Sequence, residues 1–336
     1  MTLEELSLDF KASKDVDTSI SILRRFTEIT PLIQKAIDFS IQQHQGQYRK
    51  SGEEYVNHPI LTAALVAYYG GDEAVIVAGL LHDVVEDTDC DIKTIDKLFT
   101  KEVGGLVEGL TKIMEIRGNE LIPSSSSDKI IASALTFRKM LLASISDVRV
   151  LVIKLCDRLH NMMTLHGLPE AKQKRISEET VVVYAPIAHR LGIASIKNYL
   201  EDTSFYYVMP QEYKRIDDFI NEHKQQFQLR LNHFASKIRT LMIKNGFNED
   251  EFTIIKRVKH HYSIYLKMQR KGISLEEVLD LLAIRVIVKR TLDCYKVLGI
   301  IHQEFNPLIS RFKDYIAISK ENGYQTIHTM VFNDKS

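Results

Sequence analysis

An apolar run that ends in a group of acids, residues 71–87, constrains the fold of this chain most strongly. Its sequence, GDEAVIVAGLLHDVVED, has Ala and Leu at helical spacing, which predicts a mostly buried helix. His82 and Asp83 follow at the inner end of that helix, and Glu86 lies four residues after His82 on the same face. Imidazole and carboxylate groups together favour a divalent metal, and Glu86 would accept a proton from a water that the metal activates. Because an isolated His-Asp pair is more often an ordinary helix end with solvated acids, the neighbouring sequence must decide.

The composition favours a soluble globular protein with about two domains. The 336 residues are 45% hydrophobic and 26% charged, with a formal net charge of zero, so any anion-binding region is local. No apolar run reaches the roughly 18 residues of a membrane span, and the acidic start MTLEELSLDF does not resemble a signal peptide. We therefore expect a cytoplasmic chain without a membrane partner. Cys90, Cys156 and Cys294 are odd in number and far apart, which predicts free thiols.

A polar loop, GQYRKSGEEYVNHP at residues 46–59, precedes the apolar run and is rich in possible ligands. Its cationic and hydroxyl side chains suit a phosphate, and these are Arg49, Lys50 and Ser51. His58 stands before Pro59, which favours the first turn of a helix and fixes the backbone there. Predicted helices 59–69 and 72–86, separated by two glycines, form a hairpin that brings His58 near His82 and Asp83. Without the His-Asp pair downstream, an ordinary solvated turn would be the preferred interpretation of this loop.

A second apolar helix, predicted over residues 147–165, carries a polar stripe. Asp157, Asn161 and Thr164 follow one another at positions i, i+4 and i+7, so they share one face. That face either lines a site or is simply solvent-exposed. The serine-rich segment before this helix, residues 122–128, is expected to be a loop that ends in a helix N-cap at Ser127 or Asp128.

Four segments together resemble the hydrolase domain of the Rel/SpoT family, which makes and destroys the alarmones ppGpp and pppGpp. They are YRKSGEEYVNH (48–58), LLHDVVED (80–87), IKLCDRLHNMMT (153–164) and YAPIAHRLGIASI (184–196). The resemblance implies one Mn²⁺ ion, with ligands at His58, His82, Asp83 and Asp157. It implies that Glu86 and Asp87 handle the attacking water, and that the nucleotide is held by Arg49, Lys50, Ser51, Asn161 and Thr164. The implied reaction removes the 3′-pyrophosphate and gives GDP or GTP.

The second half of the chain changes from helical to mixed composition. Helices are expected near 186–206 and 211–244, and they predict a connector over residues 196–245 between domains at 1–195 and 246–336. Alternating β-branched residues place Arg257 and Lys259 on one face of a strand. Residues 280–288 suit a central strand, and Asn322-Gly323 predicts a tight hairpin. These features alone fit nucleic-acid and nucleotide binding equally well.

Segments spread over residues 256–329 resemble the alarmone synthetase domain of the same family. They include KRVKHHYSIYLKMQRKG and RFKDYIAISKENGYQTIHT, and RFKD (311–314) is the basic variant typical of members with both activities. The resemblance implies Mg²⁺ at Asp280, and nucleotide contacts for ATP and for GDP or GTP at Arg257, Lys259, Ser263, Lys267, Lys320, Tyr324 and His328. Val258 and Ser319 depart from the family, which usually has proline at both positions.

The expected fold is a mainly α-helical HD-type hydrolase domain followed by a smaller, incomplete α/β synthetase domain of nucleotidyltransferase type. The family's glutamate-bearing strand and regulatory domains do not follow Phe332 here, so we expect a truncated form or an excised fragment that hydrolyses ppGpp without making it. Any ribosome association would then depend on domains absent from this chain. Two alternatives remain open: another HD-superfamily nucleotide phosphohydrolase, and a non-catalytic RNA-binding protein.

Overall fold

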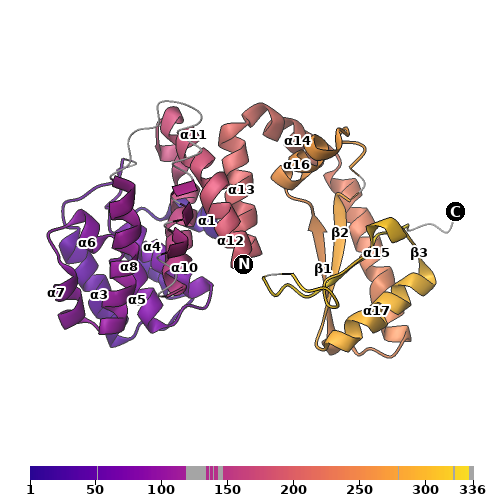
Figure 1. Cartoon of the computed structure of the whole chain (residues 1–336), viewed down its shortest axis with the longest axis horizontal. Helices are drawn as coiled ribbons and strands as arrows, with labels where there is room; N and C mark the ends of the chain where they lie inside the picture. The colour runs from indigo at the N-terminus through magenta and orange to yellow at the C-terminus, as the bar shows by residue number, and fades with distance from the viewer. Residues whose placement is uncertain are drawn as a thin grey trace. The chain divides into compact units, whose positions relative to one another are not determined.

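The chain folds into two compact units in the computed structural model (Figure 1). The structure describes residues 1–50, 52–118, 134–135, 137–138, 140–142, 147–278, 280–320 and 322–332. The first unit comprises Met1–His189 and Ile193–Val208, and the second comprises Arg190–Gly192 and Met209–Ser336. The residues predicted as a connector, 196–245, therefore divide between the two units. The predicted serine-rich loop at 122–128 lies outside the described residues.

The described part of the first unit is mainly helical, with an isolated β-bridge between Tyr48 and Glu54 in one loop. They are α1 (Leu3–Ala12), α2 (Val16–Leu23), α3 (Pro31–Gln43), α4 (Asn57–Tyr68), α5 (Glu73–Leu81), α6 (Val84–Asp87), α7 (Ile92–Leu98), α8 (Lys101–Gly118), α10 (Arg149–Met163), α11 (Glu170–Glu179), a π-helical turn (Thr180–Tyr184), α12 (Ala185–Arg190) and α13 (Ala194–Val208). Many begin at a side chain that accepts a hydrogen bond from the first turn, as Asp15, Thr30 and Asp72 do. These caps satisfy backbone amides that would otherwise lack partners.

Helices α4, α5 and α10 form the centre of the first unit and pack against one another. Every residue of α4 from Asn57 to Ala67 is buried, and so is α5 from Val75 to Leu81. Helix α8 packs closely on α10 at Gly109, which has no side chain. A Cβ atom at this position would lie only 2.8 Å from Val150 Cγ2. The His-Asp pair therefore emerges from the most buried helices of the unit.

The predicted helix 72–86 is interrupted at the His-Asp pair, which corrects the sequence-based expectation. Helix α5 ends at Leu81, and α6 begins at Val84. His82 Nδ1 donates to the Gly79 carbonyl at 2.8 Å, an acceptor that a continuing helix would give to the amide of Asp83. Asp83 leaves ideal helical geometry, with φ −98° and ψ −8°. The interruption turns both side chains toward α4 and α10.

Two other predicted helices are also divided. The helix expected near 186–206 is split into α12 and α13 at Gly192, whose φ of +77° favours glycine. The helix expected near 211–244 consists of α14 (Pro210–Glu222) and α15 (Lys224–Lys244). His223 separates them, with φ −95° and ψ 4°, and its ring Nδ1 donates to the Phe219 carbonyl at 2.9 Å.

The second unit is built on an antiparallel pair, β1 (Phe252–Val258) and β2 (Leu282–Val288), in which Ile255 lies opposite Arg285. Helix α16 (His261–Lys271) connects the two strands, and α17 (Thr291–Glu304) follows them. The core lies between one face of this sheet and helices α15 and α17, where Ile238, Met242, Phe252, Val297, Ile300 and Phe305 are buried. The unit is therefore α/β with an antiparallel sheet.

Two details of the second unit differ from the sequence prediction. Among the described residues β2 pairs with β1 alone, so it is not a central strand. The predicted tight hairpin is a longer connection, because β4 (Lys313–Asp314) pairs with β5 (Ile327–His328) across residues 315–326. Asp314 Oδ1 accepts hydrogen bonds from the amides of Ile316 and Ala317 at 2.8 and 2.9 Å, and the backbone pairing ends after the bond from Tyr315 N to Thr326 O at 2.9 Å. A third pair joins β3 (Asn306–Pro307) and β6 (Val331–Phe332).

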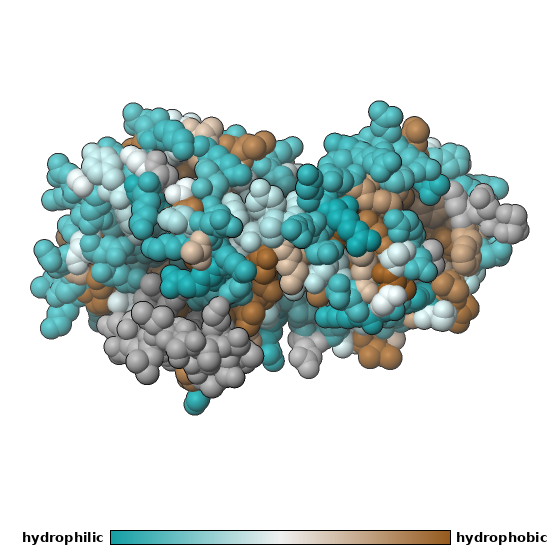
Figure 2. Space-filling view, turned by 90° about the horizontal axis from the view of Figure 1, so that it is seen from above, coloured by the Kyte–Doolittle hydropathy of each residue, from teal (hydrophilic) through white to brown (hydrophobic). Residues whose placement is uncertain are grey.

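Hydrophilic residues cover most of the face shown in Figure 2. Within the described residues every helix is too short or too polar to cross a lipid bilayer. Cys90, Cys156 and Cys294 carry free thiols, as predicted.

Candidate metal centre

Three buried side chains converge in the first unit. His58 comes from the first turn of α4, and His82 and Asp83 come from the interruption between α5 and α6. One possible ligand atom from each lies within 4.8 Å of the other two. Burial and the charge of Arg49 lower the pKa of His58 to about 4, so its ring is neutral and has a lone pair to offer.

The orientation of His82 makes this group suited to a cation. Because a carbonyl only accepts, the contact with Gly79 fixes the hydrogen on Nδ1 and leaves the lone pair of a neutral ring on Nε2. That Nε2 lies 3.1 Å from Asp83 Oδ1, and a lone pair facing a carboxylate is repulsive unless a positive charge lies between them. Burial lowers the pKa of His82, but the charge of Asp83, its hydrogen bond and the charge of Asp157 together outweigh burial and raise the pKa to about 9. Without a metal, a proton on His82 Nε2 supplies this positive charge. A bound divalent cation would supply it as well.

Asp157 borders the same group from α10. Its Oδ1 lies 3.2 Å from His58 Nε2 and 4.0 Å from His82 Nε2. Its Oδ2 pairs with Lys154 Nζ at 2.7 Å, and its Oδ1 accepts from Asn161 Nδ2 at 2.6 Å. Burial raises the pKa of Asp157, but the charge of Lys154, the hydrogen bond with His58 and the charge of His82 together hold that pKa well below its usual range. The structure thus brings all four predicted ligand residues together.

Glu86 and Asp87 lie on α6, one turn after the His-Asp pair. Burial raises the pKa of Glu86 to about 7, which suits a group that exchanges protons near neutral pH. Asp87 Oδ2 accepts a hydrogen bond from the Tyr55 hydroxyl at 2.8 Å, and Asp83 Oδ2 lies at the same distance from that hydroxyl. The Tyr55 hydroxyl has one hydrogen, so it donates a hydrogen bond to either Asp83 or Asp87 at any moment. Burial and both acids raise the pKa of Tyr55, so it stays protonated.

The predicted nucleotide contacts surround Arg49. Its guanidinium donates to Asn161 Oδ1 at 2.7 Å and to Thr164 Oγ1 at 3.4 Å, so the polar stripe of α10 faces the polar loop. Lys50 is exposed and lies beside Lys172 of α11, whose pKa it lowers. Ser51 lies outside the described residues.

Three buried or half-buried residues of the centre were missed by the sequence reasoning. Tyr55 stands three residues before His58 in the same loop, and Lys154 and His160 stand three residues on either side of Asp157. Spacing of three on a helix places both on the face of Asp157, and this signal was available in the sequence. His160 Nδ1 lies 2.8 Å from His58 Nδ1, and both rings are buried.

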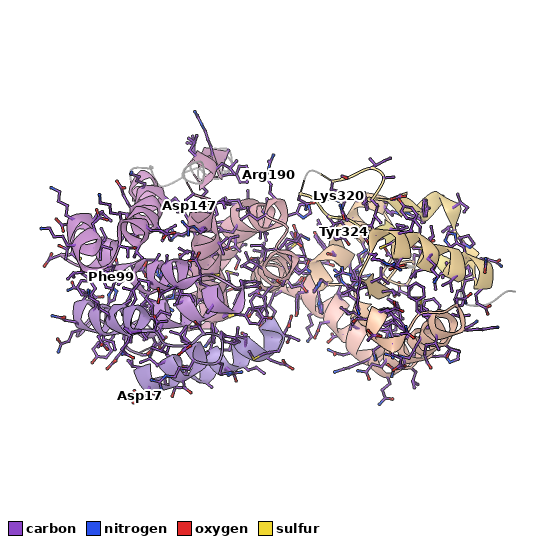
Figure 3. All side chains as sticks on the ribbon, turned by 90° about the horizontal axis from the view of Figure 1, so that it is seen from below. Asp17, Phe99, Asp147, Arg190, Lys320 and Tyr324 are labelled. Carbon is purple, nitrogen blue, oxygen red and sulfur yellow. The ribbon has the colours of Figure 1, made fainter. Side chains whose placement is uncertain are left out.

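The predicted synthetase residues gather within the second unit. Asp280 pairs with Lys259 Nζ at 3.0 Å and also with Lys267 of α16. Lys320 lies over the rings of Tyr315 and Tyr324, at 4.3 and 5.2 Å, and Tyr324 contacts His328 at 3.4 Å. Figure 3 labels Lys320 and Tyr324. Arg257 lies on β1, and Ser263 lies on α16.

Comparison with known proteins identifies the family. The family described as HD domain matches residues 36–194, and the region found in RelA / SpoT proteins matches residues 256–336. The chain belongs to the Rel/SpoT family. The two regions follow in the predicted order and confirm a mainly helical HD domain followed by a smaller α/β region.

Relatives within the Rel/SpoT family carry names for two activities. The guanosine-3′,5′-bis(diphosphate) 3′-pyrophosphohydrolase of Aquifex aeolicus is 42% identical over 315 residues, which are 94% of this chain and 43% of the relative. The probable enzyme of the same name from Synechocystis is 43% identical over 300 residues, 89% of this chain and 38% of the relative. The GTP pyrophosphokinase of Myxococcus xanthus is 41% identical over 305 residues, 91% of this chain and 39% of the relative. This Rel/SpoT chain thus spans less than half the length of these relatives.

Proposed function

We propose that the first unit removes the 3′-pyrophosphate of ppGpp or pppGpp and gives GDP or GTP and pyrophosphate. The observation that carries this proposal is the buried group of His58, His82 and Asp83 beside a carboxyl whose pKa is near neutrality. Support also comes from the HD region and from relatives named pyrophosphohydrolases.

The proposed cofactor is one Mn²⁺ ion. His58 and His82 would hold it through Nε2, and Asp83 and Asp157 through carboxylate oxygens. Two imidazoles and two carboxylates form a donor set of intermediate hardness, which Mn²⁺ accepts. When bound, the ion supplies Lewis acidity and neutralises the charge that develops on phosphoryl oxygens.

The side chains around the centre would carry the remaining steps. Glu86, as carboxylate, accepts a proton from the attacking water while the water oxygen bonds to the phosphorus nearest the ribose. The bond from that phosphorus to the 3′ oxygen breaks, and the 3′ oxygen takes up the proton that Glu86 accepted from the water. Asp87 is held by Tyr55 and helps to position the water. Arg49 neutralises phosphate charge, and its bonds to Asn161 and Thr164 fix its direction.

Alarmone synthesis is a second candidate activity, because residues 256–336 match the RelA/SpoT region and one relative is named a pyrophosphokinase. Asp280 is the proposed Mg²⁺ ligand, but two lysines now hold its carboxylate. Mg²⁺ would have to displace them, so we propose that residues 1–336 alone make little ppGpp from ATP and GDP. Incubation with both nucleotides and Mg²⁺, with hydrolysis blocked by Asp83→Ala, tests this, and robust accumulation of ppGpp would refute it.

The products formed from ppGpp test the main proposal. With Mn²⁺, the chain should release GDP and pyrophosphate in equal amounts and should turn over dGTP far more slowly. Preferred turnover of dGTP would favour another phosphohydrolase of the HD type. Tight, salt-dependent RNA binding without any hydrolysis would favour the RNA-binding alternative.

A further inference from the structure

The side of the His58 ring that faces away from the centre contacts a second buried histidine. His58 Nδ1 and His160 Nδ1 are 2.8 Å apart, and the ring centroids are 4.7 Å apart. A hydrogen bond between two ring nitrogens contains one hydrogen, so one nitrogen donates and the other accepts. The direction of this bond determines which nitrogen of His58 offers a lone pair to a metal.

The surroundings of His58 decide that direction once a cation binds. Its Nε2 lies 3.2 Å from Asp157 Oδ1 and 3.6 Å from Asp83 Oδ2, so Nε2 is the ligating nitrogen. A neutral imidazole that ligates through Nε2 carries its hydrogen on Nδ1 and donates it. His160 Nδ1 must then accept, and the neutral His160 ring carries its own hydrogen on Nε2.

The hydrogen on His160 Nε2 requires a buried acceptor. Among the described residues neither this atom nor Asn57 Nδ2 has a hydrogen-bond partner, and both atoms are buried. A partly open cavity of about 20 Å³ is lined by both residues and by ten others, among them Phe10, His58 and Leu61 and the polar Arg49, Glu53 and Thr164. That volume accommodates one water molecule, and leaving a buried donor without an acceptor is unfavourable. One water in this cavity would give the buried donor of His160 an acceptor.

We propose that His160 is a positioning residue that holds His58 in the form with its hydrogen on Nδ1, and that a water in the adjoining cavity accepts the hydrogen of His160 Nε2. The bond prepares His58 Nε2 for the cation and fixes the plane of its ring. This inference rests on the proposed metal centre, but it is independent of the substrate.

Two substitutions of His160 separate hydrogen bonding from packing. In His160→Asn, the amide oxygen lies near the former Nδ1 position and still accepts from His58, whereas His160→Phe keeps a ring without an acceptor. Phe10→Leu is the control, because the Phe10 ring lies 5.6 Å from the ring of His160 and makes no hydrogen bond to it. Mn²⁺ affinity is measured by calorimetry on the full chain without nucleotide. Circular dichroism without metal checks the fold of each variant.

We expect His160→Phe to weaken Mn²⁺ binding about 10–100-fold, as losses of such supporting bonds usually do. His160→Asn and Phe10→Leu should stay within about threefold of the original chain. Equal losses in both His160 variants, or unchanged affinity in His160→Phe, would overturn the proposal.

A measurement on the unsubstituted chain does not depend on variants that fold. With ¹⁵N-labelled histidine and Zn²⁺ as a diamagnetic probe, the ring nitrogens should show hydrogen on Nδ1 of His58 and on Nε2 of His160. The reverse pattern in the metal-bound protein would overturn the proposal. Because both experiments use metal alone, their outcome is separate from whether the chain hydrolyses ppGpp.

Discussion

Replacing Lys154 with methionine should destabilise the metal-free protein, and metal should restore much of the loss. Lys154 is buried, and its Nζ lies 2.7 Å from Asp157 Oδ2. At that distance, with an effective dielectric constant of about 20, the attraction is about 6 kcal/mol. Removing the lysine also removes the cost of burying its charge. The free energy of unfolding should therefore fall by about 3–5 kcal/mol, the usual cost of leaving one buried charge unpaired.

A bound divalent cation should compensate Asp157 in the same way. We therefore expect the metal-induced stabilisation to be larger in Lys154→Met than in the original chain. Thermal and urea unfolding should be followed by circular dichroism with and without Mn²⁺. The unfolding transition that Mn²⁺ shifts reports on the unit with the metal centre, and this transition is the one to compare. For a unit of this size, 3–5 kcal/mol corresponds to about 6–20 °C without metal.

The control for this experiment is Lys112→Met, which removes an exposed pair with Glu108 at 2.8 Å in the same unit. Such surface pairs contribute less than about 1 kcal/mol to the free energy of unfolding. Mn²⁺ should not change the effect of Lys112→Met on stability. If Lys154→Met lowers the free energy of unfolding by less than about 1 kcal/mol, Lys154 does not compensate the buried charge of Asp157. A larger loss that Mn²⁺ leaves unchanged would show that the cation does not compensate Asp157.

Three further predictions concern the centre itself. Asp83→Ala should weaken Mn²⁺ binding at least about tenfold, measured by calorimetry, while the circular dichroism spectrum stays unchanged. Wild-type Mn²⁺ affinity in this variant would contradict the assignment. Glu86→Gln should lower kcat while Mn²⁺ still binds, whereas Arg49→Ala should mainly raise KM; equal metal loss in both would refute this division of roles. Because burial raises the pKa of Glu86 to about 7 and a base must be ionised, kcat should fall as pH drops through a value no higher than about 7. A pH profile of Glu86→Gln should lack that decline.

Local sequence patterns predicted the elements that carry these residues, whereas the proposed ligand set came from the resemblance to the Rel/SpoT family. The polar stripe over 147–165 is a real face of α10, and His58 stands at the start of α4 as the following proline suggested. The interruption at His82 was not predictable from periodicity, because it arises when a side chain takes the Gly79 carbonyl. Lys154 and His160 share the spacing of Asp157, but their roles follow only from the packing of α10 on α4.

The second unit shows a different limit of sequence reasoning. Alternating β-branched residues identified β1 and a short apolar run identified β2, and both strands bury one face against helices. Asn322-Gly323 is a strong hairpin signal, yet the strands separate much earlier, where the Asp314 carboxylate binds two nearby amides. Such side-chain bonds depend on local geometry that residue preferences do not encode.

Hydrolysis of ppGpp by chain stripped of metal and then resupplied with Mn²⁺ tests the central claim most directly. Release of pyrophosphate should be absent after chelation, return when Mn²⁺ is added, and stay absent in Asp83→Ala at the same Mn²⁺ concentration. Pyrophosphate release at the original rate from the stripped chain, or from Asp83→Ala, would contradict the assignment of this buried group as the hydrolytic centre.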